Sequence, residues 1–175
     1  SPKVNSFGRL SELVNPNHLV KYFRQDASIG ILKAVSSKAV EINTKRQEMT
    51  NKQYQNVLTA LDGNEQFLYS YQNEIHEGLI GLVAGKYTRQ YNRPSFVMSL
   101  DIDKNIYKGS ARGIEGLSLN NIFKQVEDIL DSYGGHALAG GFSVKFDNVE
   151  KLKQKLTVYL DEQLENYRPP LIDVL

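Results

Sequence analysis

The stretch SYGGHALAGGFSV, residues 132–144, decides how the second half of the chain folds. It holds four glycines and His136 between Gly134 and Gly141, directly before an alternating run that predicts a strand over 140–146. Two consecutive glycines can turn successive N–H groups into one concavity that suits an anion. The alternative is a glycine-rich connection between a helix and a strand, with a packed histidine. These residues alone leave both interpretations open.

Short apolar runs alternate with turn residues from residue 66 onward. The predicted elements are a strand over 66–71, a helix over 78–91, a hairpin of strands over 95–100 and 105–113, a helix from its cap Ser118 through Leu130, a strand over 140–146, and a last helix that begins at Asp147 with Glu150 in a capping-box arrangement. This alternation predicts an α/β fold in which helices flank a mixed β-sheet.

The first third of the chain is predicted to be helical. Apolar residues recur at helical spacing from Asp26, a plausible N-cap, to about Leu61, and DGN at 62–64 is a stop signal. One helix of roughly 30 residues, or two in tandem, would fit this pattern and would suit a connector. We therefore expect three parts: a long helical connector over 1–62, an α/β domain over 63–167, and the start of a truncated following domain over 168–175.

The composition excludes several classes of protein. Hydrophobic residues make up 41% and charged residues 23% of the chain, as in a globular protein, and no apolar run reaches the length of a membrane helix. The absence of cysteine excludes disulfides and thiolate metal sites, and it fits a cytoplasmic setting. Residues 1–60 carry nine Lys and Arg against four Asp and Glu. That excess suits either a phosphate-bearing partner or a solvated helix surface.

Two further stretches resemble anion sites. His76 lies at the expected start of the helix over 78–91, where free N–H groups and the helix dipole favour an anion. The alternative is that His76 caps or packs against the helix. Ser110 and Arg112 lie at a strand end, where a hydroxyl and a guanidinium suit a phosphate or carboxylate. The alternative there is a hairpin turn with a surface arginine.

Motifs of metal-dependent or nucleophilic catalysis are absent from the sequence. It contains no HxxxH, HExxH, GxxxxGK[ST] or GxSxG pattern and no carboxylate cluster with metal-ligand spacing. His18, His76 and His136 are widely separated, so we expect no metal site within this chain. The residues present can bind phosphate, and none of them forms an evident centre that would cleave it.

Several segments in this order resemble one family. They are PKVNSFGRL (2–10), EINTKRQE (41–48), IHEGLIGLVAGKYTRQYNRPSFVMS (75–99), KGSARGIEGLSL (108–119), YGGHALAGGFSV (133–144) and PPLIDVL (169–175). They are similar to the DHHA1 domain of DHH-family phosphoesterases, whose signature is G-G-H, and in particular to RecJ single-stranded-DNA exonucleases. The chain departs from the pattern at Ile75, Lys86 and Gly113, where the family usually has Trp, Arg and Ser.

The resemblance implies the C-terminal, substrate-binding part of a hydrolase that degrades single-stranded DNA from the 5′ end, in DNA repair and recombination. The Asp-His-His motif that holds manganese or magnesium in this family is absent from the chain. The connector would therefore follow a missing N-terminal DHH domain, this chain would hold no cofactor, and alone it would be inactive. The implied partners are single-stranded DNA and that DHH domain, in a monomeric cytoplasmic protein without membrane contact. Residues 168–175 would lead into an OB-fold.

The resemblance also assigns roles to the candidate residues. His136, with the backbone of Gly134–Gly135, would contact the phosphate near the scissile bond as the catalytic residue of this part, and would not bind metal. Ser110 and Arg112 would grip the nucleotide or its neighbour, and His76 would support the same face. Two alternatives stay open. One is a DHH–DHHA1 phosphodiesterase of oligoribonucleotides or cyclic dinucleotides, and the other is a non-catalytic nucleic-acid-binding module.

Overall fold

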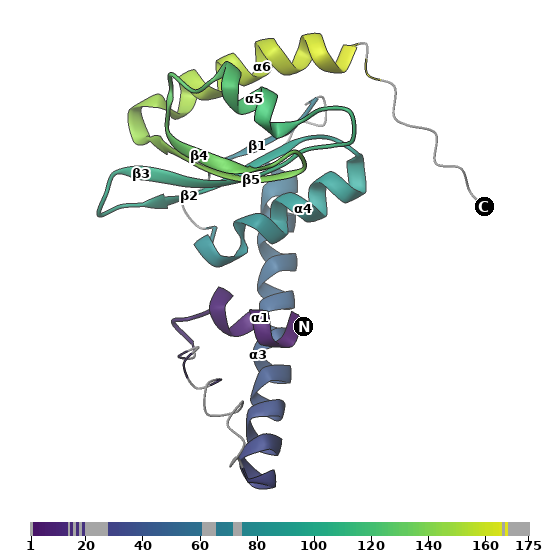
Figure 1. Cartoon of the computed structure of the whole chain (residues 1–175), viewed down its shortest axis with the longest axis vertical. Coiled ribbons are helices and arrows are strands. Elements are labelled where there is room, and N and C mark those ends of the chain that lie inside the picture. The colour runs from purple at the N-terminus through teal and green to yellow at the C-terminus, as the bar shows by residue number, and fades with distance from the viewer. Residues whose placement is uncertain are drawn as a thin grey trace, which may run out of the picture. The chain divides into compact units, whose positions relative to one another are not determined.

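The computed structural model describes residues 2–13, 15, 17, 19, 28–60, 66–71, 75–165 and 167 (Figure 1). Contacts divide the chain into two compact units, Ser1–Gln53 and Tyr54–Leu175. Some predicted features lie outside the described residues. They are the N-cap Asp26, the stop at 62–64, His18 and the tail 168–175.

The first unit is helical. Helix α1 spans Pro2–Arg9, and helix α3 spans Ile29–Thr59 as one uninterrupted helix of 31 residues, whose last residues, from Tyr54 on, belong to the second unit. Of the two predicted arrangements, the single helix is therefore the one that forms. Ser28 precedes it, and its Oγ accepts a hydrogen bond from the Ile31 N–H at 3.4 Å, as an N-cap side chain does. Among the described residues of this unit, the buried apolar ones are Phe7, Leu10, Ala39 and Ile42.

The second unit is built on a five-stranded mixed sheet with the order β1-β2-β3-β5-β4. Strand β1 pairs parallel with β2, and the other neighbours are antiparallel. The strands are β1 (Leu68–Ser70), β2 (Ser95–Asp101), β3 (Ile106–Arg112), β4 (Leu130–His136) and β5 (Ala139–Lys145). The predicted α/β class, with a mixed sheet flanked by helices, is confirmed.

Helices cover both faces of this sheet, as Figure 1 shows. A 3-10 turn, η1 (Glu77–Leu79), leads into α4 (Ile80–Tyr91), which packs on one face together with the last turns of α3. Helices α5 (Leu119–Gln125) and α6 (Val149–Glu165) pack on the opposite face around the larger core. A second 3-10 turn, η2 (Phe146–Asn148), contains the predicted start of the last helix, so α6 begins slightly later than expected.

Strand β4 was not among the predicted elements. Ser118 caps α5 as predicted, with its Oγ accepting a backbone N–H at 3.3 Å, but the helix ends at Gln125 and does not reach Leu130. Val126 and Ile129 are also apolar at helical spacing, but they lie in the turn after the helix, which buries them in the core. Leu130 begins β4 instead.

The Gly134–Gly135 pair also differs from the prediction. Strands β4 and β5 form a hairpin closed by residues 137–138, and Gly134 lies opposite Gly141. The alternative of a glycine-rich connection between a helix and a strand is therefore wrong, because pairing with β5 holds both glycines in a strand ladder. Gly135 has a φ of 141°, which disfavours other residues, and a Cβ there would lie 2.5 Å from the Ala139 carbonyl oxygen.

Candidate functional site

Antiparallel pairing brings the predicted site residues of β3 and β4 onto one face of the sheet. Residues paired across neighbouring strands point to the same face, and the two strands are separated only by β5. Two adjacent rows result. The first contains Ser110, Gly141 and Gly134, and the second contains Arg112, Ala139 and His136. The rows lie roughly 7 Å apart, and Arg112 and His136 are about 10 Å apart across two strands. We call these six residues the platform.

Most of the platform is open to solvent. Helix α4 and the end of α3 pack over β1, β2 and part of β3 on this face. Residues Gly134, His136, Ala139 and Gly141 are exposed, whereas Ser110 and Arg112 are half-buried. The platform is therefore an area of small residues with an arginine at one side and a histidine at the other.

Arg112 is held by its own strand. Its Nη1 donates to the Ser110 Oγ at 2.9 Å and to the Ala111 carbonyl oxygen at 2.7 Å. Helix α4 passes close to this side chain, because a Cβ at Gly81 would lie 2.9 Å from the Arg112 Nη2 and 3.1 Å from the Ser110 Oγ. The missing side chain at Gly81 thus leaves room for the guanidinium. A guanidinium fixed in this way suits bidentate binding of a phosphate or carboxylate.

Two platform glycines face open space. An added Cβ at Gly134 would meet no atom within 4 Å, and at Gly141 it would meet only the Gly109 carbonyl oxygen at 3.8 Å. A Cβ at Gly109, on the opposite face, would lie 2.2 Å from the Cζ of Phe142. Packing therefore requires glycine at Gly109. At Gly134 and Gly141 the missing side chain has a different effect, which is to leave the backbone accessible from the platform side.

His136 is the last residue of β4, where it lies opposite Ala139 beside the hairpin turn. Its side chain is exposed, so the alternative of a packed histidine is wrong. The small side chains of Gly134 and Ala139 leave space beside the imidazole. His136 can therefore donate a hydrogen bond to a ligand on the platform without displacing a neighbour.

His76 acts as a cap. Its Nδ1 accepts the Gly78 N–H at 3.0 Å at the start of η1, which is the capping alternative that the sequence left open. With Nδ1 as an acceptor, the neutral ring carries its proton on Nε2. The next residue, Glu77, forms an ion pair with Lys108 of β3. The turn that carries His76 thus lies at the Lys108 end of β3, one row away from Ser110.

Lys108 occupies the row next to the platform. Its Nζ lies 3.0 Å from Glu77 and 3.2 Å from Asp101. Hydrogen bonds to Glu77 and then to Asp101 raise the pKa of Lys108, and the same contact from Lys108 lowers the pKa of Asp101. Sequence reasoning did not select Lys108, because a strand lysine is ordinarily solvated. In the structure it links η1 to the β2–β3 hairpin and so helps to place the turn before α4.

Metal binding and membrane spanning find no support in the described part of the chain. No three His, Cys, Asp or Glu residues there are placed to hold a metal ion. The helices among these residues are not long and apolar enough to cross a bilayer. The groups that the platform offers, a guanidinium, an imidazole, a hydroxyl and accessible backbone, are those that bind an oxyanion.

Known proteins resemble most of this chain. It is similar to the single-stranded-DNA-specific exonuclease RecJ of Bacillus subtilis (strain 168), with 27% identity over 167 residues, which are 94% of this chain and 21% of that protein. The RecJ of Haemophilus influenzae is also 27% identical, over 93% of this chain and 30% of that protein. The chain thus spans less than a third of the length of these relatives.

The fold is similar to that of solved structures. The crystal structure of RecJ in complex with Mn²⁺ from Thermus thermophilus matches with a TM-score of 0.81 and 22% identity, over 97% of this chain and 24% of that chain. A pGpG-specific phosphodiesterase from Vibrio matches with a TM-score of 0.51 and 16% identity, over 71% of this chain and 42% of that one. At these identities the likeness shows the fold alone. The DHHA1 domain model matches residues 64–162, more than half of the chain, so the chain belongs to the DHHA1 domain family.

Proposed function

We propose that this chain is the substrate-binding part of a larger RecJ-like exonuclease that hydrolyses single-stranded DNA from the 5′ end. The relatives that match nearly the whole chain carry that name, and each is at least three times longer than the matched region. The observation that carries the proposal is the platform. It gathers residues separated by some 30 positions in the sequence into two adjacent rows that suit a phosphate.

Each platform residue has a role in this proposal. Arg112, oriented by Ser110, binds the oxygens of the neighbouring phosphate through its guanidinium. Gly134 and Gly141 allow the sugar-phosphate backbone to approach the strands closely. His136 donates a hydrogen bond to the phosphate near the scissile bond from the opposite side of the platform. The Gly135 backbone shapes the hairpin next to it. His76 supports the same face indirectly, by capping the turn that leads into α4.

Bond cleavage itself is assigned to a domain outside this chain. The described residues offer no metal site, so the divalent ions, manganese or magnesium, would be held by a DHH domain that precedes residues 1–62. When bound there, such ions supply charge neutralisation and an activated water. The chain would then bind and orient the strand, with 1–62 as the connector, 63–167 as the DHHA1 domain and 168–175 as the start of the next domain.

The substrate class is the part of the proposal that an enzyme assay tests directly. The full-length protein, loaded with Mn²⁺, is incubated with single-stranded DNA, duplex DNA, short oligoribonucleotides and cyclic dinucleotides. We expect progressive 5′ to 3′ digestion of single-stranded DNA. Preference for oligoribonucleotides or cyclic dinucleotides would replace the proposed activity with that of a related phosphodiesterase. No hydrolysis of any of them would favour a non-catalytic nucleic-acid-binding module.

The role of the platform is tested with two variants and one control. Loss of a hydrogen bond to a charged group costs about 1.5–3 kcal/mol, so Arg112→Ala and His136→Ala are each expected to lower kcat/KM by about 10-fold to 100-fold. Lys124→Ala removes an exposed cation from α5 on the other face of the sheet and should change nothing. Near-normal rates for both platform variants would contradict the assignment.

The chain by itself provides a further test. We expect no hydrolysis and at most weak, salt-sensitive binding of single strands, because the metal-bearing domain is not included. Manganese-dependent hydrolysis by the 175-residue chain would contradict this division of labour. A monomeric state, a cytoplasmic location and a place in DNA repair and recombination are also part of the proposal. Light scattering of the full-length protein checks the first of these.

A further inference from the structure

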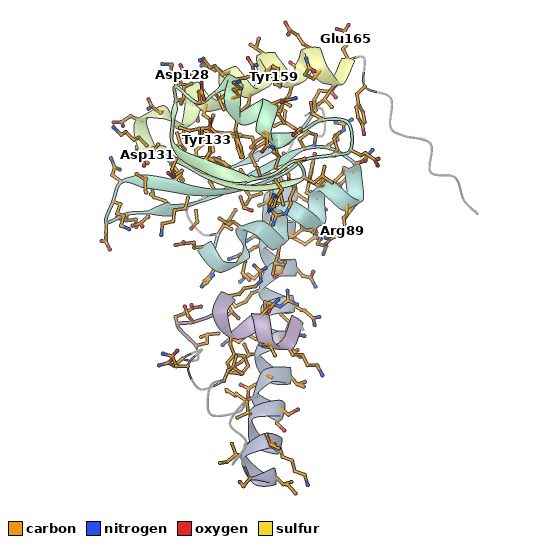
Figure 2. The ribbon with its side chains drawn as sticks, in the orientation of Figure 1. Arg89, Asp128, Asp131, Tyr133, Tyr159 and Glu165 are labelled. Carbon is orange, nitrogen blue, oxygen red and sulfur yellow. The ribbon has the colours of Figure 1, made fainter. Side chains whose placement is uncertain are left out.

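A second guanidinium lies beside Arg112. Arg89 is an exposed residue in the last turn of α4 (Figure 2). A Cβ added at Gly85 would lie 3.5 Å from the Arg89 Nη1 and 3.7 Å from the Arg112 Nε. Because both distances are measured from one point, these two nitrogens are no more than about 7 Å apart. Two positive charges, one from a helix and one from a strand, thus converge over the same glycine.

The stability of α4 does not require Arg89 to lie beside Arg112. A basic residue in the last turn interacts favourably with the helix dipole, but it does so from any side of the helix. Arg89 instead lies on the side that faces β3, close to the guanidinium of Arg112. An anion that binds between the two side chains is attracted by both positive charges. A phosphate that accepts one charge-assisted hydrogen bond of about 2.8 Å from each side chain would fit a separation of this size between the Arg89 and Arg112 nitrogens.

We infer that Arg89 and Arg112 together bind one phosphate group, next to the phosphate that contacts His136. The inference rests on the proposed function for its ligand, a nucleic-acid strand. It adds a residue from α4 to the platform, so the bound strand would run across β4, β5 and β3 toward the end of α4. Glycine at Gly81 and Gly85 supports this geometry, because it lets the Arg112 side chain lie against the helix.

The test measures binding to the full-length protein without divalent metal, so that the strand is not hydrolysed. Fluorescence anisotropy of a labelled oligothymidylate is recorded over a range of salt concentrations for the wild type, Arg89→Gln, Arg89→Lys and the control Lys124→Gln. We expect Arg89→Gln to weaken binding about 10-fold and to reduce the slope of log affinity against log salt by about 0.7. Arg89→Lys should restore the slope and only part of the affinity, because lysine keeps the charge and loses the fork. Lys124→Gln should match the wild type.

A second measurement separates this inference from the proposed function. The increase in melting temperature caused by inorganic pyrophosphate is compared between the same variants. One outcome is that the wild type binds no single strands, while pyrophosphate raises the melting temperature of the wild type but not that of Arg89→Gln. That result would support the phosphate site and contradict the proposed function. If single strands bind and Arg89→Gln leaves affinity and salt slope unchanged, the inference is overturned and the proposed function stands. A loss of stability in Arg89→Gln with an unchanged slope also overturns it, because Arg89 then contacts a carboxylate of another domain.

Discussion

Replacing Gly134 with alanine should have opposite effects on the stability of the fold and on ligand binding. The new Cβ would meet no atom within 4 Å, and Gly134 is not among the glycines with positive φ. Alanine also restricts the unfolded chain, so we expect the folded state to gain about 0.4–1 kcal/mol. For a protein of 175 residues this corresponds to a rise in Tm of up to roughly 4 °C.

The effect on the proposed activity is opposite. The methyl group would stand between the β4 backbone and a bound phosphate and would hold the phosphate away from the His136 imidazole, whose hydrogen bond to it would contribute about 1.5–3 kcal/mol. We therefore expect kcat/KM on single-stranded DNA to fall at least about 10-fold in the full-length variant. Thermal unfolding followed by circular dichroism measures the stability, and an exonuclease assay measures the turnover.

Gly30→Ala is the matched control. Glycine at this position lies near the start of α3, and a Cβ there would be at an ordinary distance of 3.8 Å from the Ser28 Oγ. It should raise Tm to a similar extent and leave turnover unchanged. Normal turnover in Gly134→Ala would refute the idea that the open backbone of β4 belongs to the binding site. A lower Tm in Gly134→Ala would refute the idea that packing leaves this glycine unconstrained.

Three further changes test the surroundings of the platform. Gly109→Ala places a Cβ within the ring of a buried phenylalanine and should destabilise the fold by about 1–3 kcal/mol in urea unfolding; an unchanged midpoint would contradict it. Gly81→Ala should displace the flexible end of Arg112. We therefore expect KM to rise while the urea midpoint changes little, and an unchanged KM would show that the position of the guanidinium is unimportant. Because Lys108 lowers the pKa of Asp101 below its ordinary value of 3.8, their contact stabilises the protein above that pH and is lost as pH falls through the lowered pKa. The difference in urea midpoint between the wild type and Lys108→Met should therefore shrink in acid, and a constant difference would contradict this.

Elements with a clear pattern could be predicted from the sequence. The helix over 78–91 corresponds to η1 and α4, and the strands over 95–100 and 105–113 correspond to β2 and β3. Alternating side chains and the turn residues between these segments mark their ends within a few residues. Local preference and tertiary packing agree there, so the pattern is sufficient.

Strand β4 shows where that agreement fails. Val126 and Ile129 are apolar at helical spacing because a turn buries them, and the following strand is exposed along nearly its whole length. An exposed edge strand that contains Gly134 and Gly135 has no buried face, so it lacks the alternation that marks a strand. Pairing with β5 decides its conformation, and that pairing is not visible in the sequence of β4 alone.

The candidate site divides in the same way. Residue type and the neighbouring glycines predicted Ser110, Arg112 and His136 as candidate groups for binding an anion. Their arrangement in adjacent rows depends on which strands pair and in which register, and spacing along the chain does not specify that. The same holds for Gly81 and Gly141, whose significance depends on which atoms lie nearby. For His76 two roles were compatible with the sequence, and only the hydrogen bond from the Gly78 N–H distinguishes them.

The hairpin of β4 and β5 also has to avoid sliding by one residue, since each slip turns every side chain to the other face. A slip in one direction would put His136 at the place of Gly135, where a Cβ would lie 2.5 Å from the Gly140 Cα. A slip in the other direction would remove Tyr133 from its contact with Phe123, whose ring centroid is 5.5 Å away. Both errors disturb contacts that lie outside the platform. These contacts therefore favour the alignment that presents the imidazole to a ligand, and variants at Phe123 would alter binding without touching the platform.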